Sequence, residues 1–203
     1  MFYLDGGGVC FDATSCANAN TPSTGERAGP DYDPNIEGEN PASEGGMFDF
    51  ARADNPFRDY SFIYVPLCTA DSHLGNLTRE YSPKLTVEHK GFVNSTAALN
   101  YLAEHYPNAT QVVVVGKTAG SVAAPIYGGL IADLLPNAQI TVFGAQSGAF
   151  PDDPDLNAKI DEVWGAFDNM PDWEVNGVKL VDWIKALIAG EPLDDLHCDK
   201  CAE

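Results

Sequence analysis

The sequence has few basic residues and no long apolar run. Only 11 Lys and Arg stand against 30 Asp and Glu in 203 residues, which gives a formal net charge of -19 at pH 7. A chain with this charge repels phosphate backbones and anionic headgroups, so we exclude binding to nucleic acids and to membrane surfaces. No apolar stretch reaches the roughly 18 residues that a membrane-spanning helix needs. Internal repeats and heptad patterns are also absent from the sequence.

A leader sequence is missing as well, because Met1 is followed at once by the apolar run 2–4. The cysteines point to secretion, since five are more than a cytosolic core usually carries and an odd number leaves one over. They are Cys10, Cys16, Cys68, Cys198 and Cys201. We therefore expect a secreted or extracytoplasmic protein whose signal peptide has been lost by truncation.

Hydrophobic residues make up 44% of the chain, and its length suits one domain with a substantial core. Within the first 150 residues, short apolar runs alternate with helical patterns. The runs are continuous, which predicts strands buried on both faces, at 2–4, 62–65, 112–115 and 140–143. Helices are expected at 97–106, with Asn94 and Ser95 as possible caps, and from 118 to about 135. This alternation predicts an α/β fold with a mostly parallel sheet of about four core strands.

Two further segments differ from this core in composition. Residues 17–48 are rich in Gly, Pro, Asn and Asp and too long for an ordinary connection, which predicts a surface insertion. Residues 151–203 are acidic and contain all three tryptophans, and amphipathic helices are expected at about 155–164 and 178–189. We therefore assign residues 1–150 to the core and residues 151–203 to a helical, cap-like segment of the same domain.

A buried strand, a tight turn and a helix follow one another in residues 111–121, Gln-Val-Val-Val-Val-Gly-Lys-Thr-Ala-Gly-Ser. Gly116 and Gly120 flank Thr118 as the glycines of a Gly-Xaa-Ser-Xaa-Gly nucleophile elbow flank its serine. A β-branched residue resists the backbone angles of an elbow. The same glycine spacing also occurs where a helix packs closely on a strand, so the pattern leaves both interpretations open. A phosphate-binding P-loop is excluded, because strand valines occupy the stretch that should be a flexible loop.

Three consecutive glycines, Gly6 to Gly8, follow the first apolar run. In α/β-hydrolases a glycine run at the end of a strand donates backbone N–H groups to the oxyanion of a tetrahedral intermediate. The amide that follows the elbow residue completes this oxyanion hole, and here it belongs to Ala119. A glycine run and an elbow about 110 residues apart together favour acyl transfer.

The chain resembles the pectin acetylesterase and Notum family of carboxylesterases over most of residues 2–150. The resemblance rests on five motifs, at 2–12 with Cys16, 62–76, 89–94, 115–125 and 144–150. It implies a three-layer α/β-hydrolase-like fold, secretion, disulfides and ester hydrolysis by a Ser-His-Asp triad without a metal or other cofactor. The substrate it implies is an acyl ester, either small or carried on a carbohydrate.

Carried onto this sequence, the resemblance places Thr118 at the nucleophile position and the amides of Gly7, Gly8 and Ala119 in the oxyanion hole. It pairs Cys10 with Cys16 in a short-range disulfide, and Cys68 with an upstream cysteine that this chain does not contain.

The family's catalytic Asp and His have no counterpart that we can assign, because the family places them after two further strands. Of the histidines, only His197 lies in the C-terminal segment, and its surroundings do not resemble the family's histidine motif. We therefore expect an incomplete hydrolase fold, truncated at both ends. The alternative is a catalytically inactive family member, or a fragment, that binds an acylated ligand.

Two features bear on ligands. Cys198 and Cys201, next to His197, have a spacing that suits zinc or redox sites, but the sequence offers no second ligand pair, so we expect no metal. A polyanionic substrate such as pectin would be repelled unless a basic patch such as Arg79, Lys84 and Lys90 lined the cleft. An acyl ester on a neutral carrier fits the charge equally well.

Overall fold

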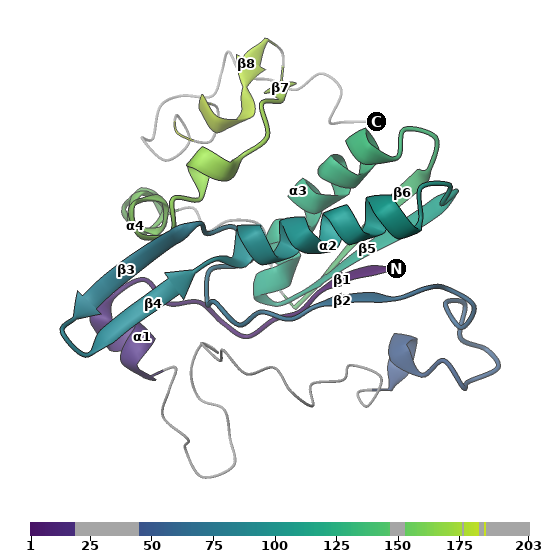
Figure 1. The fold of residues 1–203 in the computed structure, drawn as a ribbon, viewed down its shortest axis with the longest axis horizontal. Helices are drawn as coiled ribbons and strands as arrows, with labels where there is room; N and C mark the ends of the chain where they lie inside the picture. The colour runs from purple at the N-terminus through teal and green to yellow at the C-terminus, as the bar shows by residue number, and fades with distance from the viewer. Residues whose placement is uncertain (19–44, 147–152, 176, 183–184, 186–203) are drawn as a thin grey trace.

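The computed structural model describes residues 1–18, 45–146, 153–175, 177–182 and 185 (Figure 1). Its centre is a parallel four-stranded sheet in the order β2-β1-β5-β6. Leu4 pairs with Val65 on one side and with Gly116 on the other, so the carboxyl ends of these strands meet at one edge. The predicted α/β class and the four core strands are confirmed. The strands are β1 (Phe2–Leu4), β2 (Ile63–Val65), β5 (Gln111–Lys117) and β6 (Gln139–Ala145).

Two helices, α2 (Gly91–His105) and α3 (Ala119–Leu134), cover one face of this sheet (Figure 1). Helix α4 (Pro154–Trp164) packs beside β3 (Leu77–Ser82), and its buried side chains join the same core. Phe2 and Leu4 on β1 share a buried cluster with Leu99, Tyr127 and Trp164 from the helices. Burying one side chain of this size contributes roughly 1.5–3 kcal/mol. The described C-terminal residues therefore pack into the same core as the strands.

The opposite face of the sheet is covered by a loop with the short 3-10 helix η2 (Gly46–Phe48). Tyr3 packs there against Phe48 and Phe62, with ring centroids 4.7 and 6.0 Å apart. In the described chain this layer is therefore aromatic loop rather than a long helix. The predicted insertion at 17–48 falls mostly on residues 19–44, which lie outside the described residues, and it stays a prediction.

Helix α2 begins at Gly91, earlier than predicted, and the expectation that Asn94 or Ser95 caps it is wrong. Both residues lie inside the helix. The carboxylate of Asp71, 20 positions earlier, accepts a hydrogen bond of 2.7 Å from the Gly91 amide. Because this cap comes from a distant loop, local sequence signals could not reveal where the helix starts.

The continuous apolar run at 140–143 predicted that β6 is buried on both faces, and this prediction is wrong. Val142 is 43% exposed and Phe143 is 51% exposed. Among the described residues, β6 pairs only with β5 and forms the edge of the sheet. The continuous apolar run therefore predicted the strand correctly, but it did not predict that β6 pairs with only one other strand among the described residues.

Two antiparallel hairpins in the structure were not predicted from the sequence. One pairs β3 (Leu77–Ser82) with β4 (Leu85–His89), and the other pairs β7 (Glu174–Val175) with β8 (Val178–Lys179). The helix predicted at about 178–189 is wrong at its start, since Val178 and Lys179 belong to β8, but residues 180–182 and 185 are helical as predicted. The other residues of this segment lie outside the described part of the chain. Helix α4 confirms the prediction for 155–164, and the side chain of Asp153 caps it by accepting from the Leu156 amide. The short elements α1 (Ala13–Asn18) and η3 (Phe167–Asn169) complete the described fold.

No helix within the described residues is both long enough and apolar enough to span a membrane.

Candidate functional site

Thr118 lies between the end of β5 and the first residue of α3 with φ 49° and ψ -113°. A non-glycine residue in such a conformation costs roughly 1–3 kcal/mol, and such strain concentrates at functional sites. The Thr118 amide donates to the carbonyl of Ala145 at 2.8 Å, and the hydroxyl and amide of Ser121 donate to the Thr118 carbonyl. These bonds hold the strained backbone, while the residue itself is exposed at the carboxyl edge of the sheet.

The glycines around Thr118 allow strand and helix to approach each other closely. A Cβ at Gly116 would lie 2.3 Å from the carbonyl oxygen of Gly120, and a Cβ at Gly120 would lie 2.2 Å from that of Leu4. No side chain fits at either position without moving backbone. The two interpretations of the glycine spacing are therefore compatible, because the close packing and the strained turn occur together.

The glycine run after β1 lies directly beside Thr118. A Cβ at Gly6 would come within 2.9 Å of the Thr118 hydroxyl oxygen. The Gly6 amide donates to its neighbour Asp5, whereas the amides of Gly7 and Gly8 donate to no other group in the described part of the chain. Ala119 is the first residue of α3, where the helix dipole favours negative charge. The structure thus brings Thr118, the glycine run and a helix N-terminus together.

Asp5 anchors the start of the glycine run. Its carboxylate accepts hydrogen bonds from the hydroxyls of Tyr3 and Tyr64, at 3.0 and 2.8 Å, and from the Gly6 amide at 2.8 Å. The ammonium group of Lys117 lies 3.8 Å from the same carboxylate. Lys117, which precedes Thr118, is therefore ion-paired with Asp5, which precedes the glycine run.

His73 is a buried neighbour of the site. Its Nε2 lies 2.9 Å from the carbonyl oxygen of Asp5 and its Nδ1 lies 3.2 Å from the hydroxyl of Ser95. A carbonyl can only accept, so Nε2 carries the hydrogen and Nδ1 accepts from Ser95. Burial lowers the pKa of His73 to about 4, which keeps the ring neutral. Both ring nitrogens are engaged, so His73 is not available as a general base.

Asp71 organises the loop that carries His73. Its fully buried carboxylate accepts from the Thr69 hydroxyl and the Gly91 amide, both at 2.7 Å, and from the His73 amide at 3.2 Å. Burial raises the pKa of Asp71 to about 6, and these hydrogen bonds act in the opposite direction. Ala70, Ser72 and His73 all have positive φ, so this buried network holds a strained loop.

Neither of the other two described histidines faces Thr118 as a general base. His89 is buried, burial lowers its pKa to about 4, and its nitrogens contact the Thr69 carbonyl and the Tyr81 hydroxyl. His105 is exposed at the end of α2 and stacks on Tyr101. His197 lies outside the described residues. The triad histidine and aspartate therefore remain unassigned within the described chain.

The expected disulfide between Cys10 and Cys16 is present, directly after the glycine run. The Cys68 sulfur accepts a hydrogen bond of 3.6 Å from the side-chain Nδ2 of Asn94. Cys198 and Cys201 lie outside the described residues.

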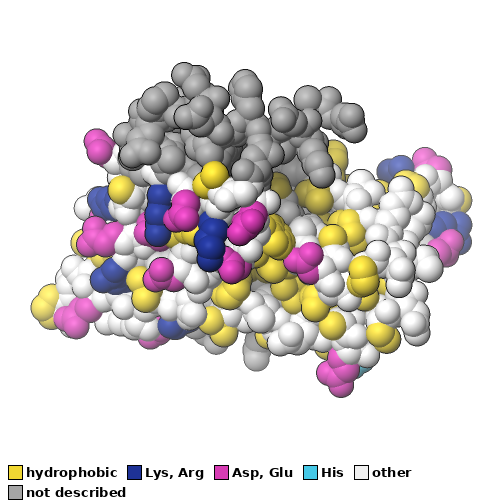
Figure 2. Space-filling view, turned by 90° about the horizontal axis from the view of Figure 1, so that it is seen from above, with side chains coloured by type: hydrophobic (Ala, Val, Ile, Leu, Met, Phe, Trp, Pro, Cys, Tyr) yellow, Lys and Arg dark blue, Asp and Glu magenta, His cyan; other side chains and the backbone are white. Residues whose placement is uncertain are grey.

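Two of the three basic residues named as a possible cleft patch, Arg79 and Lys90, are engaged in structural contacts. The Arg79 guanidinium donates to the carbonyl groups of Glu162 and Val163 at the end of α4, and the Lys90 ammonium donates to the carbonyl of Asn76 at 3.1 Å. Figure 2 shows acidic and basic side chains interspersed on the face that it presents. That face shows no extended basic surface suited to a polyanion.

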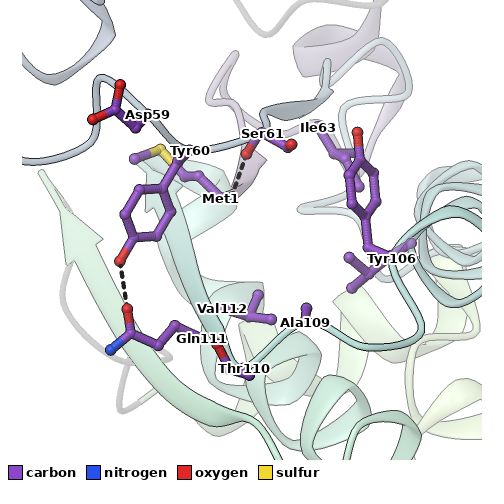
Figure 3. A pocket seen from close by; sticks show the side chains of 11 residues that line it. Met1, Asp59, Tyr60, Ser61, Ile63, Tyr106, Ala109, Thr110, Gln111 and Val112 are labelled. Atoms are coloured by element: carbon purple, nitrogen blue, oxygen red, sulfur yellow. Dashed lines mark hydrogen bonds between the residues drawn. The ribbon is translucent and has the colours of Figure 1, made fainter.

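A cavity of about 260 Å³ lies at the other end of the sheet. Met1, Gln111 and Val112 line it at the amino ends of the strands, and the Tyr60 hydroxyl donates to the Gln111 side chain there (Figure 3). Ligands of open α/β sheets bind at the carboxyl ends of the strands. Thr118 directly follows the other end of β5, which extends about 20 Å from Gln111 to Lys117, so the cavity is separate from the site around Thr118.

Comparison with known proteins bears on this site. A protein-family model, described as pectinacetylesterase, matches residues 1–176. The match includes β1, the glycine run, β5, Thr118 and α4. A comparison with curated proteins gives no match. Since the family model covers most of the 203 residues, the chain belongs to the pectinacetylesterase family, a family of carboxylic ester hydrolases.

Proposed function

We propose that the protein hydrolyses a short acyl ester, with the Thr118 hydroxyl attacking the ester carbonyl. The observation that carries this proposal is the strained conformation of Thr118, φ 49°, at a turn between β5 and α3 that exposes one side chain. A turn that served packing alone would not need a non-glycine residue in a conformation that costs roughly 1–3 kcal/mol. The strain is therefore better explained by a hydroxyl held for chemistry.

The amides of Gly7, Gly8 and Ala119 form the proposed oxyanion hole. The two glycine amides have no acceptor among the described residues, and the Ala119 amide lies at a helix N-terminus. Donors fixed before the reaction stabilise the developing oxyanion without reorganisation, and removing one such donor typically costs about 10²–10³ in kcat. Hydrolysis then breaks the ester bond, releases the alcohol and transfers the acyl group first to Thr118 and then to water.

The substrate we propose is an acetyl or similar short acyl group on a neutral small molecule or carbohydrate. Family membership supports the ester, and the net charge of -19 together with the engaged basic side chains argues against a polyanionic carrier. The Cys10–Cys16 disulfide supports a site of action outside the cytoplasm.

A second candidate function is the binding of an acylated ligand without turnover. It is favoured by the β-branched Thr118, whose methyl group crowds the nucleophilic oxygen, and by the engaged nitrogens of His73 and His89. Both candidates use the same surface and differ only in whether the Thr118 hydroxyl becomes acylated.

Turnover of p-nitrophenyl acetate by the full chain distinguishes them. Under the proposed function, Thr118→Ala abolishes turnover, and Thr118→Ser raises kcat/KM by about 10-fold, a difference of about 1.4 kcal/mol, because the crowding methyl group is gone. Thr86→Ala and Thr86→Ser serve as matched controls, since Thr86 is exposed on β4 and makes no contact with the site. Equal activity of the chains with Thr, Ser and Ala at position 118 would refute a nucleophilic role.

A covalent probe tests the nucleophile directly. An alkyl fluorophosphonate loses fluoride when a nucleophilic oxygen attacks phosphorus, so a label found by mass spectrometry on the peptide containing Thr118 supports hydrolysis. Saturable binding of an acetylated sugar, without labelling of either the unchanged chain or the Thr118→Ser variant, would support the binding function instead.

A further inference from the structure

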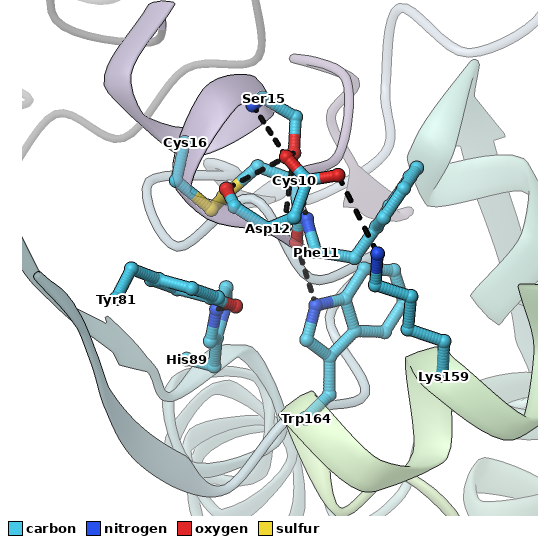
Figure 4. Close-up of polar contacts among 9 residues, drawn as sticks. All are labelled: Cys10, Phe11, Asp12, Ser15, Cys16, Tyr81, His89, Lys159 and Trp164. Atoms are coloured by element: carbon cyan, nitrogen blue, oxygen red, sulfur yellow. Dashed lines mark hydrogen bonds and ion pairs between the residues drawn. A yellow bond between two sulfur atoms is a disulfide. The ribbon is translucent and has the colours of Figure 1, made fainter.

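Three side chains that bind soft metals meet in the core beside the glycine run. Cys10 follows that run, Cys16 lies on α1 and His89 ends β4, and all three are buried (Figure 4). One ligand atom from each lies within 4.8 Å of the other two. In the structure the two sulfur atoms are joined in a disulfide. The inference below concerns the same chain after that bond is reduced, and it does not depend on ester hydrolysis.

The ring of His89 is oriented as metal-binding histidines are. Its Nδ1 lies 3.0 Å from the carbonyl oxygen of Thr69, which can only accept, so Nδ1 carries the hydrogen. The lone pair is therefore on Nε2, where it accepts from the Tyr81 hydroxyl at 2.8 Å. Histidines that bind metals typically donate their other ring hydrogen to a backbone carbonyl or a carboxylate, which fixes the tautomer and the ring orientation.

The backbone around the two cysteines is held by bonds that do not depend on the disulfide. The Cys10 amide donates to the carbonyl of Ala70, and the indole of Trp164 donates to the carbonyl of Cys10, both at 2.9 Å. The Cys16 amide donates to the carbonyl of Asp12, also at 2.9 Å.

The turn between the cysteines is also fixed locally. The Ser15 hydroxyl oxygen accepts from the amides of Phe11 and Asp12, and the Ser15 amide donates to the Asp12 carboxylate at 2.8 Å. These contacts keep both cysteines beside His89 when the bond between the sulfur atoms is broken. The ligands are therefore largely in place before a metal binds, which lowers the free-energy cost of forming a site.

We propose that reduction of the Cys10–Cys16 disulfide creates a site for one zinc ion, bound by both cysteine sulfurs and by Nε2 of His89. A dithiol reductant gives up two hydrogens, becomes a disulfide and leaves two thiols. Zinc binding then releases two protons, and the two thiolates neutralise the charge of the ion. Two sulfurs and one imidazole form a donor set that zinc favours, with a fourth position for water or the Tyr81 hydroxyl.

This neutralisation matters because both cysteines are fully buried. Isolated thiolates would be costly in such an environment, whereas a neutral zinc–thiolate unit is not. The disulfide has no thiolate to offer, so the oxidised and zinc-bound forms exclude each other. The site is thus gated by the redox state of the Cys10–Cys16 pair.

The test measures zinc binding to the full chain in oxidised and reduced forms. Cys68, Cys198 and Cys201 are first replaced by serine, so that the terminal pair beside His197 cannot bind the metal. A phosphine reduces the disulfide without oxygen present, taking an oxygen atom from water to become its oxide. We expect one zinc ion per reduced chain and none per oxidised chain. Cobalt(II) in place of zinc should give thiolate charge-transfer bands and intense tetrahedral bands.

Variants then assign the ligands. Cys10→Ser with Cys16→Ser should abolish binding, and His89→Gln should weaken it by about 100-fold or more, since loss of even an outer contact typically costs 10–100-fold. The exposed His105→Gln is the matched control and should bind zinc normally. X-ray absorption at the zinc edge, measured on the reduced chain that keeps His89, should show two sulfurs and one imidazole bound to zinc. This measurement tests the role of His89 even if the His89→Gln variant does not fold. Equal zinc binding by oxidised and reduced chains, or two sulfurs without an imidazole, would overturn the proposal.

Discussion

His73 donates its Nε2 hydrogen to the backbone carbonyl of Asp5 across 2.9 Å, and the glycine run begins one residue later. Through its backbone and side chain, His73 is also tied to Tyr127 on α3 and Ser95 on α2. A buried ring therefore links the loop after β2 to the start of the proposed oxyanion hole. We regard His73 as a positioning residue.

Replacing His73 separates this positioning role from simple burial. His73→Leu removes the group that donates to the Asp5 carbonyl, which should lower the free energy of unfolding by about 1–3 kcal/mol. It should also lower kcat for ester hydrolysis by about 10-fold or more, because the Gly7 and Gly8 amides lose their support. Urea unfolding and initial rates on the same samples measure both effects.

The conservative variant His73→Gln provides the control, because its amide nitrogen can still donate to Asp5. We expect it to keep kcat within a few-fold of the unchanged chain. If both variants lost kcat equally while differing in stability, a positioning role through the Asp5 carbonyl would be wrong.

The same residue predicts a pH dependence of stability. The folded-state pKa of His73, about 4, is below its usual value of 6.5, so the unfolded chain takes up a proton first as the pH falls. The free energy of unfolding should therefore fall between about pH 6.5 and pH 4, by up to about 3 kcal/mol from this group. His89 acts in the same direction and Asp71 in the opposite one.

Comparison between variants isolates the contribution of His73. In His73→Gln the loss of unfolding free energy between pH 6.5 and pH 4 should be smaller than in the unchanged chain. Thr86→Ala, at an exposed position of β4 without a titratable group, should leave the profile unchanged. The measurement is urea unfolding at a series of pH values, and parallel profiles for all three chains would contradict the prediction.

Relief of strain at Thr118 should stabilise the fold. Glycine adopts φ 49° without a Cβ clash, so Thr118→Gly should raise the free energy of unfolding by about 1 kcal/mol while removing the proposed nucleophile. Thr118→Ala also removes the hydroxyl but keeps a Cβ, so it should gain less. Chemical denaturation compares the three chains, and a Gly variant less stable than the Ala variant would show that the backbone at 118 is not strained.

Close packing at Gly120 predicts a large destabilisation. A Cβ there would lie 2.2 Å from the Leu4 carbonyl oxygen, so Gly120→Ala must separate α3 from β1 and should cost about 3 kcal/mol. Gly144→Ala is a matched control on the neighbouring strand β6, because its nearest contact would be 3.3 Å from the side chain of Ser121. Thermal unfolding of both variants tests the difference, and similar melting temperatures would contradict it.

Much of the core was predictable because its signals are local. The valines of β5 and the apolar residues of β1 indicated buried strands, and the positions of Thr118 and the glycines indicated a turn with little room. Helix α4 was predicted because its hydrophobic pattern lies within the segment itself. The segment begins after the N-cap residue Asp153 and ends at the C-cap residue Gly165. The start of α2 was not predictable, because its first amide is capped by Asp71 from another loop.

The residues of the candidate site were likewise predictable from the sequence, whereas their contacts with one another were not. The sequence by itself determined which residues follow the strands, namely Thr118, Ala119 and the glycine run, because strand and turn preferences act over a few neighbouring residues. Only the tertiary structure decided that Gly6 touches Thr118, that His73 supports Asp5 and that His89 faces the Cys10–Cys16 pair. Those relationships join residues up to about 110 positions apart, and they exist only once parallel pairing has brought the carboxyl ends of the strands to one edge.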